Sequence, residues 1–151
     1  MRIVSTLIVA AALAAAFPHE ARADELPLGN WNGFAVRLNT GNQNRQPRVL
    51  VVRKVADPHV AWRGGSGELL SVSFGQNQNN MNEVSAIALA DGRLTFTVPV
   101  GDQVLTCMLV HQPKENAYVG DCSGANDFRV TLNPPPPPAP TPAAATPAEA
   151  K

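Results

Sequence analysis

The sequence predicts an all-β protein, built as a single small antiparallel up-and-down barrel of about eight strands. Stretches in which apolar and polar residues alternate recur at intervals of about ten residues, with turn residues between them. No stretch of useful length shows the 3.6-residue period of an amphipathic helix. Short hairpins in so small a chain leave hydrophobic edges unless the sheet closes on itself, and closure into a barrel is the common solution.

Composition narrows the range of functions. The 151 residues include twelve basic and twelve acidic side chains, which cancel to a net charge of zero, and only 16% of the residues are charged. This balance argues against the basic surface that binding to nucleic acid or to an anionic membrane would require. The length allows one ordinary domain at most.

The N-terminal segment, residues 1–23, is typical of a secretory signal peptide. It begins with the charged Arg2, continues as an apolar run over 3–17 and ends in a small-x-small cleavage site at 21–23. The run is about 15 residues long, whereas a membrane-spanning helix needs roughly 20, which weighs against the alternative of a retained anchor. The mature chain is therefore expected to begin at Asp24, to lack a membrane span, and to be periplasmic or secreted.

Residues 24–133 form the expected barrel domain, and two turns set the register of its second half. Asp91-Gly92 is a two-residue hairpin turn that tolerates positive φ, and it places Leu89 opposite Leu94. Gly101-Asp102 is a second such turn, which extends the same apolar face onto a third strand. The nine expected strands cover residues 30–38, 48–55, 58–63, 68–74, 82–90, 93–99, 103–111, 116–122 and 126–132.

The two cysteines, Cys107 and Cys122, are expected to form a disulfide, because an exported chain meets an oxidising compartment. Continuing the register through the next turn sets these cysteines directly opposite each other, with Leu109 opposite Gly120. Directly opposed cysteines on neighbouring antiparallel strands can approach closely enough to bond. The disulfide would then lie on the interior face and cross-link the two strands of the hairpin.

Residues 134–151 are expected to form a disordered Pro/Ala-rich tail. The segment opens with five consecutive prolines at 134–138 and then alternates alanine, threonine and proline, a composition typical of an extended polyproline II path. As a spacer it would act as a tether or as a proline-rich ligand for a groove in another exported protein. The alternative is a dispensable solubilising end.

Short motifs resemble those of lipocalin-like, calycin-type barrels. The sequence Gly-Asn-Trp-Asn-Gly at 29–33 resembles the glycine-x-tryptophan opening of that class. The stretches 87–96 and 118–120 resemble the closing hairpins of small exported bacterial barrels of uncharacterised function. The resemblance spans most of residues 29–132 and implies a barrel without implying a ligand. It also implies that Trp31 plugs the closed end of the barrel.

Possible binding residues lie in two kinds of place. Trp62, beside a glycine cluster, could stack on a ligand. The segments 75–82 and 39–46 are rich in amide side chains. Amides can bind sugars or a partner's backbone through hydrogen bonds, but amide-rich segments are more often solvated turns. The candidate amides of the first segment are Asn77, Asn79 and Asn80.

The register also predicts an apolar patch on the outer wall of the barrel. If Cys107 and Leu109 point inward, the side chains between and beside them point outward. Such patches can mark contacts with a partner, although scattered hydrophobic residues on β surfaces are ordinary. The candidate contact residues are Met108, Val110 and Val119, with Val104 beside them.

Catalysis and metal binding are not expected. His111 could act as an acid or base, and Asp121 and Ser123 lie near it in the sequence, but no nucleophile elbow, carboxylate pair or oxyanion site accompanies them. A metal site needs three or four convergent ligands, and only His59 and His111 remain after cleavage of the signal peptide. We therefore expect no enzyme activity, no cofactor and no metal.

The sequence thus favours an exported non-catalytic binding module whose ligand is an unknown small molecule. The alternative is a protein-directed role, such as an inhibitor or accessory subunit of another exported protein. The two differ in one structural feature, because a small-molecule binder needs a cavity of a few hundred cubic ångströms. A filled barrel would instead act through its outer wall or loops.

Overall fold

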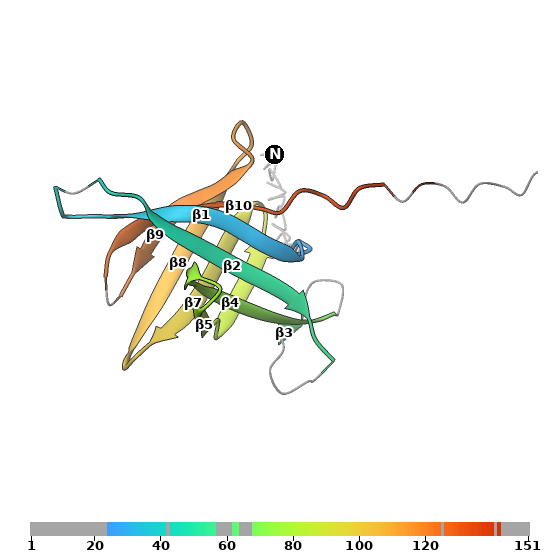
Figure 1. Ribbon diagram of the computed structural model, residues 1–151, viewed down its shortest axis with the longest axis horizontal. Helices are drawn as coiled ribbons and strands as arrows, with labels where there is room; N and C mark the ends of the chain where they lie inside the picture. Colours follow the sequence, from blue (N-terminus) through green and yellow to red (C-terminus); the bar gives the residue numbers. More distant parts are fainter. Residues whose placement is uncertain are drawn as a thin grey trace, which may run out of the picture.

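The computed structural model describes residues 24–41, 43–56, 62–63, 68–124, 126–140 and 142, and shows an all-β fold (Figure 1). The described residues contain no helix, and hence none long and apolar enough to cross a membrane. The expected signal peptide, residues 1–23, lies outside the described residues. The strands are β1 (Gly29–Arg37), β2 (Gln46–Lys54), β3 (Trp62–Arg63), β4 (Leu69–Asn77), β5 (Asn80–Glu83), β6 (Ala86–Ala90), β7 (Arg93–Val100), β8 (Gln103–Gln112), β9 (Ala117–Ser123) and β10 (Phe128–Asn133).

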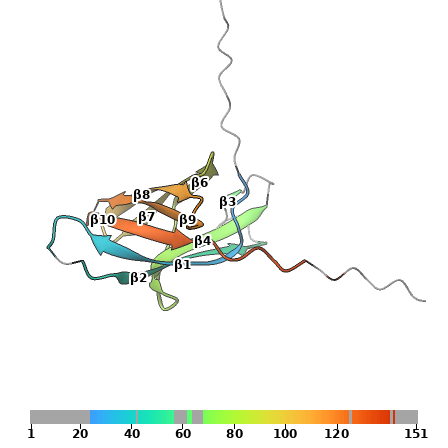
Figure 2. The ribbon, with the colours of Figure 1, turned by 90° about the horizontal axis from the view of Figure 1, so that it is seen from above.

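All strands belong to one antiparallel sheet that curls around a common interior (Figure 2). The order is β3-β4-β2-β1-β10-β9-β8-β7-β6, with β5 paired to β4. Apart from β3, neighbours in the sheet are neighbours in the chain, and β10 returns to pair with β1 from Asn32 opposite Asn133 to Arg37 opposite Phe128. This is the up-and-down order that the sequence predicts.

The two ends of the sheet meet where β5 becomes β6. β5 pairs with β4 and β6 pairs with β7, and only Val84 and Ser85 lie between them. The Val84 N–H donates to the Val72 carbonyl at 2.9 Å, and the Ser85 N–H donates to the Thr97 carbonyl at 2.8 Å. The predicted single strand 82–90 is therefore wrong, because the chain bends here to change partners. If β5 and β6 count as one bent strand and the two-residue β3 is left out, the ten strands reduce to eight.

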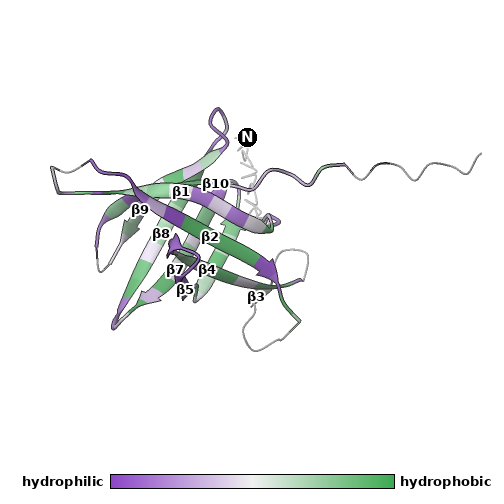
Figure 3. Cartoon of the chain, in the orientation of Figure 1, coloured by the Kyte–Doolittle hydropathy of each residue, from purple (hydrophilic) through white to green (hydrophobic). Residues whose placement is uncertain are grey.

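Alternation along each strand builds the core. In β7 the side chains of Leu94, Phe96 and Val98 are buried, while Thr95 and Thr97 between them are half-buried. Figure 3 shows apolar and polar residues mixed along the strands, with a continuous apolar stretch in the middle of β2. Burying one large apolar side chain contributes roughly 1.5–3 kcal/mol, so the core is the main source of stability. Its largest fully buried members are Trp31, Phe96, Leu50, Leu94, Leu109 and Leu132.

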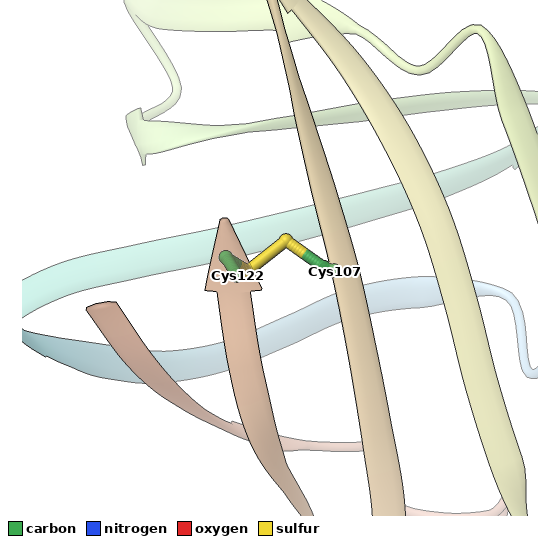
Figure 4. The surroundings of a disulfide bond; sticks show 2 residues. All are labelled: Cys107 and Cys122. Carbon is green, nitrogen blue, oxygen red and sulfur yellow. A yellow bond between two sulfur atoms is a disulfide. The ribbon is translucent and has the colours of Figure 1, made fainter. Parts of the chain in front are cut away.

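The predicted register of the second half is confirmed. Leu89 lies opposite Leu94 across β6 and β7, and Leu109 lies opposite Gly120 across β8 and β9. Cys107 and Cys122 form a disulfide between β8 and β9, with Cα atoms 4.0 Å apart and no solvent exposure of either residue (Figure 4). The turns at 91–92 and 101–102 adopt positive φ at Asp91, Gly92 and Gly101, as their sequences require.

The first half departs more from the predicted boundaries. Of the expected strand 58–63, only Trp62 and Arg63 are described, and they pair with the beginning of β4. β4 continues through the amide-rich segment as far as Asn77, where the sequence predicts a loop after residue 74. The reason is Gly75, where a Cβ atom would lie 1.9 Å from the Asn80 carbonyl oxygen. Glycine lets β5 fold back closely along β4, so the amides join the ladder.

Candidate binding site at the open end of the barrel

One end of the barrel is closed by the chain that precedes β1. The Trp31 indole is fully buried, donates its Nε1 hydrogen to the Pro27 carbonyl at 2.9 Å and lies 5.2 Å from the Tyr118 ring. Leu26 is buried in the same core, and the Asp24 N–H donates to the Leu89 carbonyl at 2.8 Å. Trp31 therefore contributes to the packing at this end and is not open to a ligand.

The opposite end contains a pocket of about 260 Å³. Its lining comes from the hairpins β1–β2, β4–β5 and β7–β8 and from the beginning of β10, all of which meet at this end. The inner wall is apolar and is formed mainly by Ala35, Phe74, Val98, Leu105 and Phe128. Amides surround it, namely Gln46, Gln76, Asn80, Asn82 and Asn126.

A buried arginine, Arg48, lines this pocket. Only 8% of the residue is exposed, and it is the one buried polar or charged residue of the described chain. Its Nη1 donates to the Pro47 carbonyl at 2.7 Å and its Nη2 donates to Gln46 Oε1 at 3.1 Å. The guanidinium carbon lies 5.4 Å from the centre of the Phe128 ring, within the range of a cation–π contact.

Strand periodicity explains why a charged side chain points inward. Arg48 is in phase with the buried Leu50 and Val52 of β2, and alternate residues of a strand share one face. Opposite it on β1 lies Gly33, which has no side chain to compete for the interior. Arg48 was not among the residues expected to bind a ligand, although its phase with Leu50 and Val52 is a signal that could have found it.

The charge around the pocket is positive. Arg37 and Arg48 both line it, and no aspartate or glutamate is among the described lining residues. Within the described chain, no carboxylate lies within 4.0 Å of either guanidinium. Burial, and then the charge of Arg37, lower the pKa of Arg48, so the folded protein holds this cation less favourably than water would.

The predicted binding amides gather at this end, although only one faces the pocket. Asn80 lines it, whereas Asn77 and Asn79 are exposed in the β4–β5 turn, where the Asn79 N–H donates to Asn77 Oδ1 at 2.9 Å. Trp62 belongs to the other end, because it pairs with Leu70 near the beginning of β4. Seven residues of strand, roughly 23 Å, separate Leu70 from Asn77. The side chain of Trp62 lies outside what the structure describes.

The outer wall of β8 is apolar, in keeping with the predicted register. Val104, Met108 and Val110 are 54%, 53% and 45% exposed. Val119 lies opposite Val110 on β9 and is half-buried. These four residues, the β8–β9 patch, lie on the opposite face of the sheet from the disulfide.

The residues that could suggest catalysis are not brought together. His111 stacks on Tyr118 with ring centres 4.9 Å apart, and its Nε2 lies 3.4 Å from Asn116 Oδ1. Asp121 pairs with Arg129 on the outer wall, at 2.8 Å. Ser123 lies opposite Thr106, five residues along β8 from His111 or roughly 17 Å away.

Within the described residues, no three histidine, cysteine, aspartate or glutamate side chains cluster as a metal site would need.

Comparisons of the chain with protein-family models, with curated proteins and with solved structures give no match.

Proposed function

We propose that the protein is an exported, non-catalytic, lipocalin-like binding module that holds a small organic molecule in the pocket lined by Arg48. The observation that supports it is the difference between the two ends of the barrel. One end is packed around Trp31, whereas the other contains an apolar pocket surrounded by amides. Pockets of this composition, with a few polar groups on an apolar wall, are typical of small-molecule sites.

The size of the pocket limits the ligand. Its volume of about 260 Å³ lies just below the range typical of drug-sized ligands. At about 30 Å³ for each water-sized group, the part of a ligand inside the pocket comes to roughly nine non-hydrogen atoms, and a longer ligand would extend through the open mouth. Export is supported by the predicted signal peptide and by the Cys107–Cys122 disulfide, since disulfides persist in oxidising compartments.

A fragment screen by protein-observed NMR tests this proposal. Compounds of about nine non-hydrogen atoms should shift the amide resonances of the pocket residues. Val100→Trp should abolish the shifts, because Val100 lines the mouth and is 38% exposed, which leaves room for the larger side chain without disturbing the core. Val104→Trp, on the outer wall, is the matched control and should bind as the wild type does. Shifts that persist in Val100→Trp would overturn the proposal.

A protein-directed role is the second candidate, and the β8–β9 patch favours it. Exposed apolar side chains that adjoin one another often mark contacts. Changing Met108 and Val110 to lysine should leave folding intact, because both side chains are about half exposed. Loss of an oligomer or of a co-purifying partner, measured by native mass spectrometry, would support this role. An unchanged mass spectrum would count against it.

A further inference from the structure

We propose that the ligand of this pocket is an organic anion, with a carboxylate on Arg48 and a small apolar body against Phe74 and Phe128. The inference rests on the proposed function, since it names the chemical class that the same pocket takes. It starts from a physical mismatch. Only 8% of the Arg48 residue is exposed, its guanidinium is partly buried, and the described chain places no acidic group beside it, although a charge removed from water is stabilised by an opposite charge.

The protein satisfies only part of the hydrogen-bonding capacity of Arg48. A guanidinium has five N–H donors, and the described chain supplies two acceptors, the Pro47 carbonyl and Gln46 Oε1. Both are neutral, so they hold the guanidinium in place without cancelling its charge. A carboxylate matches the planar fork of arginine and forms bonds about twice as strong as neutral ones.

The second arginine adds to the preference for an anion. Arg37 lies directly opposite Phe128 on β10 and lines the same pocket. Two like charges at one mouth repel each other, which is why the charge of Arg37 disfavours the charged form of Arg48. A bound anion would relieve this repulsion, whereas a cation would increase it.

The rest of the lining determines the chemical character of the part of the ligand beyond the carboxylate. Phe74 and Phe128 supply aromatic walls, and Val98 and Leu105 supply aliphatic ones. The neutral amides that surround them add hydrogen-bonding capacity without charge. The predicted ligand class is therefore a small aromatic or branched aliphatic monocarboxylate.

Three probes of one shape separate charge from size. Benzoate, benzamide and benzamidinium share a ring and a planar head but have charges of minus one, zero and plus one. Titrations of the full mature chain, followed by NMR, should show benzoate binding at least tenfold more tightly than benzamide, the ratio expected for a hydrogen bond to a charged group. Benzamidinium should not bind in the pocket. Equal binding of benzoate and benzamide would overturn the inference while leaving the proposed function intact. If none of the three binds, the inference fails, and the proposed function is decided separately by the fragment screen.

Two arginine variants show which cation is responsible. Arg48→Met keeps an unbranched, flexible side chain and removes the charged guanidinium, so benzoate binding should weaken at least tenfold while benzamide binding stays the same. Arg53→Met removes an exposed arginine of the same strand and should change neither benzoate binding nor benzamide binding. Preference for benzoate that survives in Arg48→Met would overturn the inference. The comparison of the three probes on the wild-type chain stands even if a variant fails to fold.

Discussion

At the scale of single residues, Arg48 is the clearest case of a side chain that costs stability. Its burial is not offset by an acidic partner in the described chain, and removing a charge from water costs free energy unless the charge is paired. We expect Arg48→Met to raise the free energy of unfolding of the ligand-free protein by on the order of 1 kcal/mol. Thermal melts measure it, with Arg53→Met as the control. A lower melting temperature would mean that Arg48 stabilises the strand ends through its neutral partners.

The pH dependence of this effect follows from the chemistry of arginine. The pKa of Arg48 is lowered in the folded state, so its cost is present at every pH at which the side chain is protonated. Arginine stays protonated throughout the range in which proteins are folded. The gain from Arg48→Met should therefore be the same in acid and in neutral solution.

Asp121 behaves in the opposite sense. The hydrogen bond from Arg129 lowers its pKa below the ordinary value of 3.8, against a smaller opposing effect of burial. The stability from this pair is present above pH 3.8 and is lost as the pH falls below that value, through the lowered pKa of the folded state. Melts between pH 6 and pH 2 should show a steeper acid loss for the wild type than for Asp121→Asn. The difference should be small, because both side chains are more than half exposed.

At the scale of the elements, the β8–β9 hairpin has the largest local constraint. The disulfide joins residues 15 apart in the sequence, and a closed loop of that size is worth about 3 kcal/mol through the entropy of the unfolded chain. Replacing Cys107 and Cys122 by alanine should lower the free energy of unfolding by about that amount, measured by urea denaturation. Loss of less than about 1 kcal/mol would show that the sheet holds this register without the bond.

Two neighbouring hairpins, β6–β7 and β7–β8, explain how much of the fold could be predicted. Asp91-Gly92 and Gly101-Asp102 are turn sequences with fixed loop length, and a fixed turn determines every cross-strand pair that follows it. In the first half, the two-residue turn between β4 and β5, Gln78 and Asn79, contains no glycine, and the register shifts beside it between Gly75 and Asn77. There the close approach at Gly75 and the bend at Val84 decide the pairing, and both depend on which distant strands meet.

The candidate site was harder to predict for a related reason. Asn80 could be singled out from composition, because amides accumulate around it. Arg48 looks on its own like an ordinary surface residue between apolar neighbours. Its significance depends on the absence of an acidic neighbour among the described residues, and that is a property of several strands brought together.

At the scale of the whole molecule, the boundary between barrel and tail lies slightly beyond Asn133. Residues 136–140 are exposed and lead away from the sheet (Figure 1), but Pro134 and Pro135 are half-buried, and Pro135 lies beside Gly29. Truncation after Pro135 should leave the melting temperature unchanged, because the residues removed from the described part bury little. Truncation after Asn133 should lower it slightly. A clear drop in the melting temperature on truncation after Pro135 would place the boundary further along the chain.

The junction at Val84 and Ser85 gives the barrel a seam. Elsewhere in the described sheet, neighbouring strands of the meander are joined by ladders of several residue pairs, but here the chain leaves β4 and joins β7 within two residues: the Val84 N–H donates to the Val72 carbonyl, and Ser85 bonds Thr97 through its N–H and its hydroxyl. Local opening has its lowest free energy where the fewest bonds must break together. The amide hydrogens of Val84 and Ser85 should therefore exchange with deuterium faster than those of β7 and β8. Local opening of the barrel should begin at this junction before global unfolding.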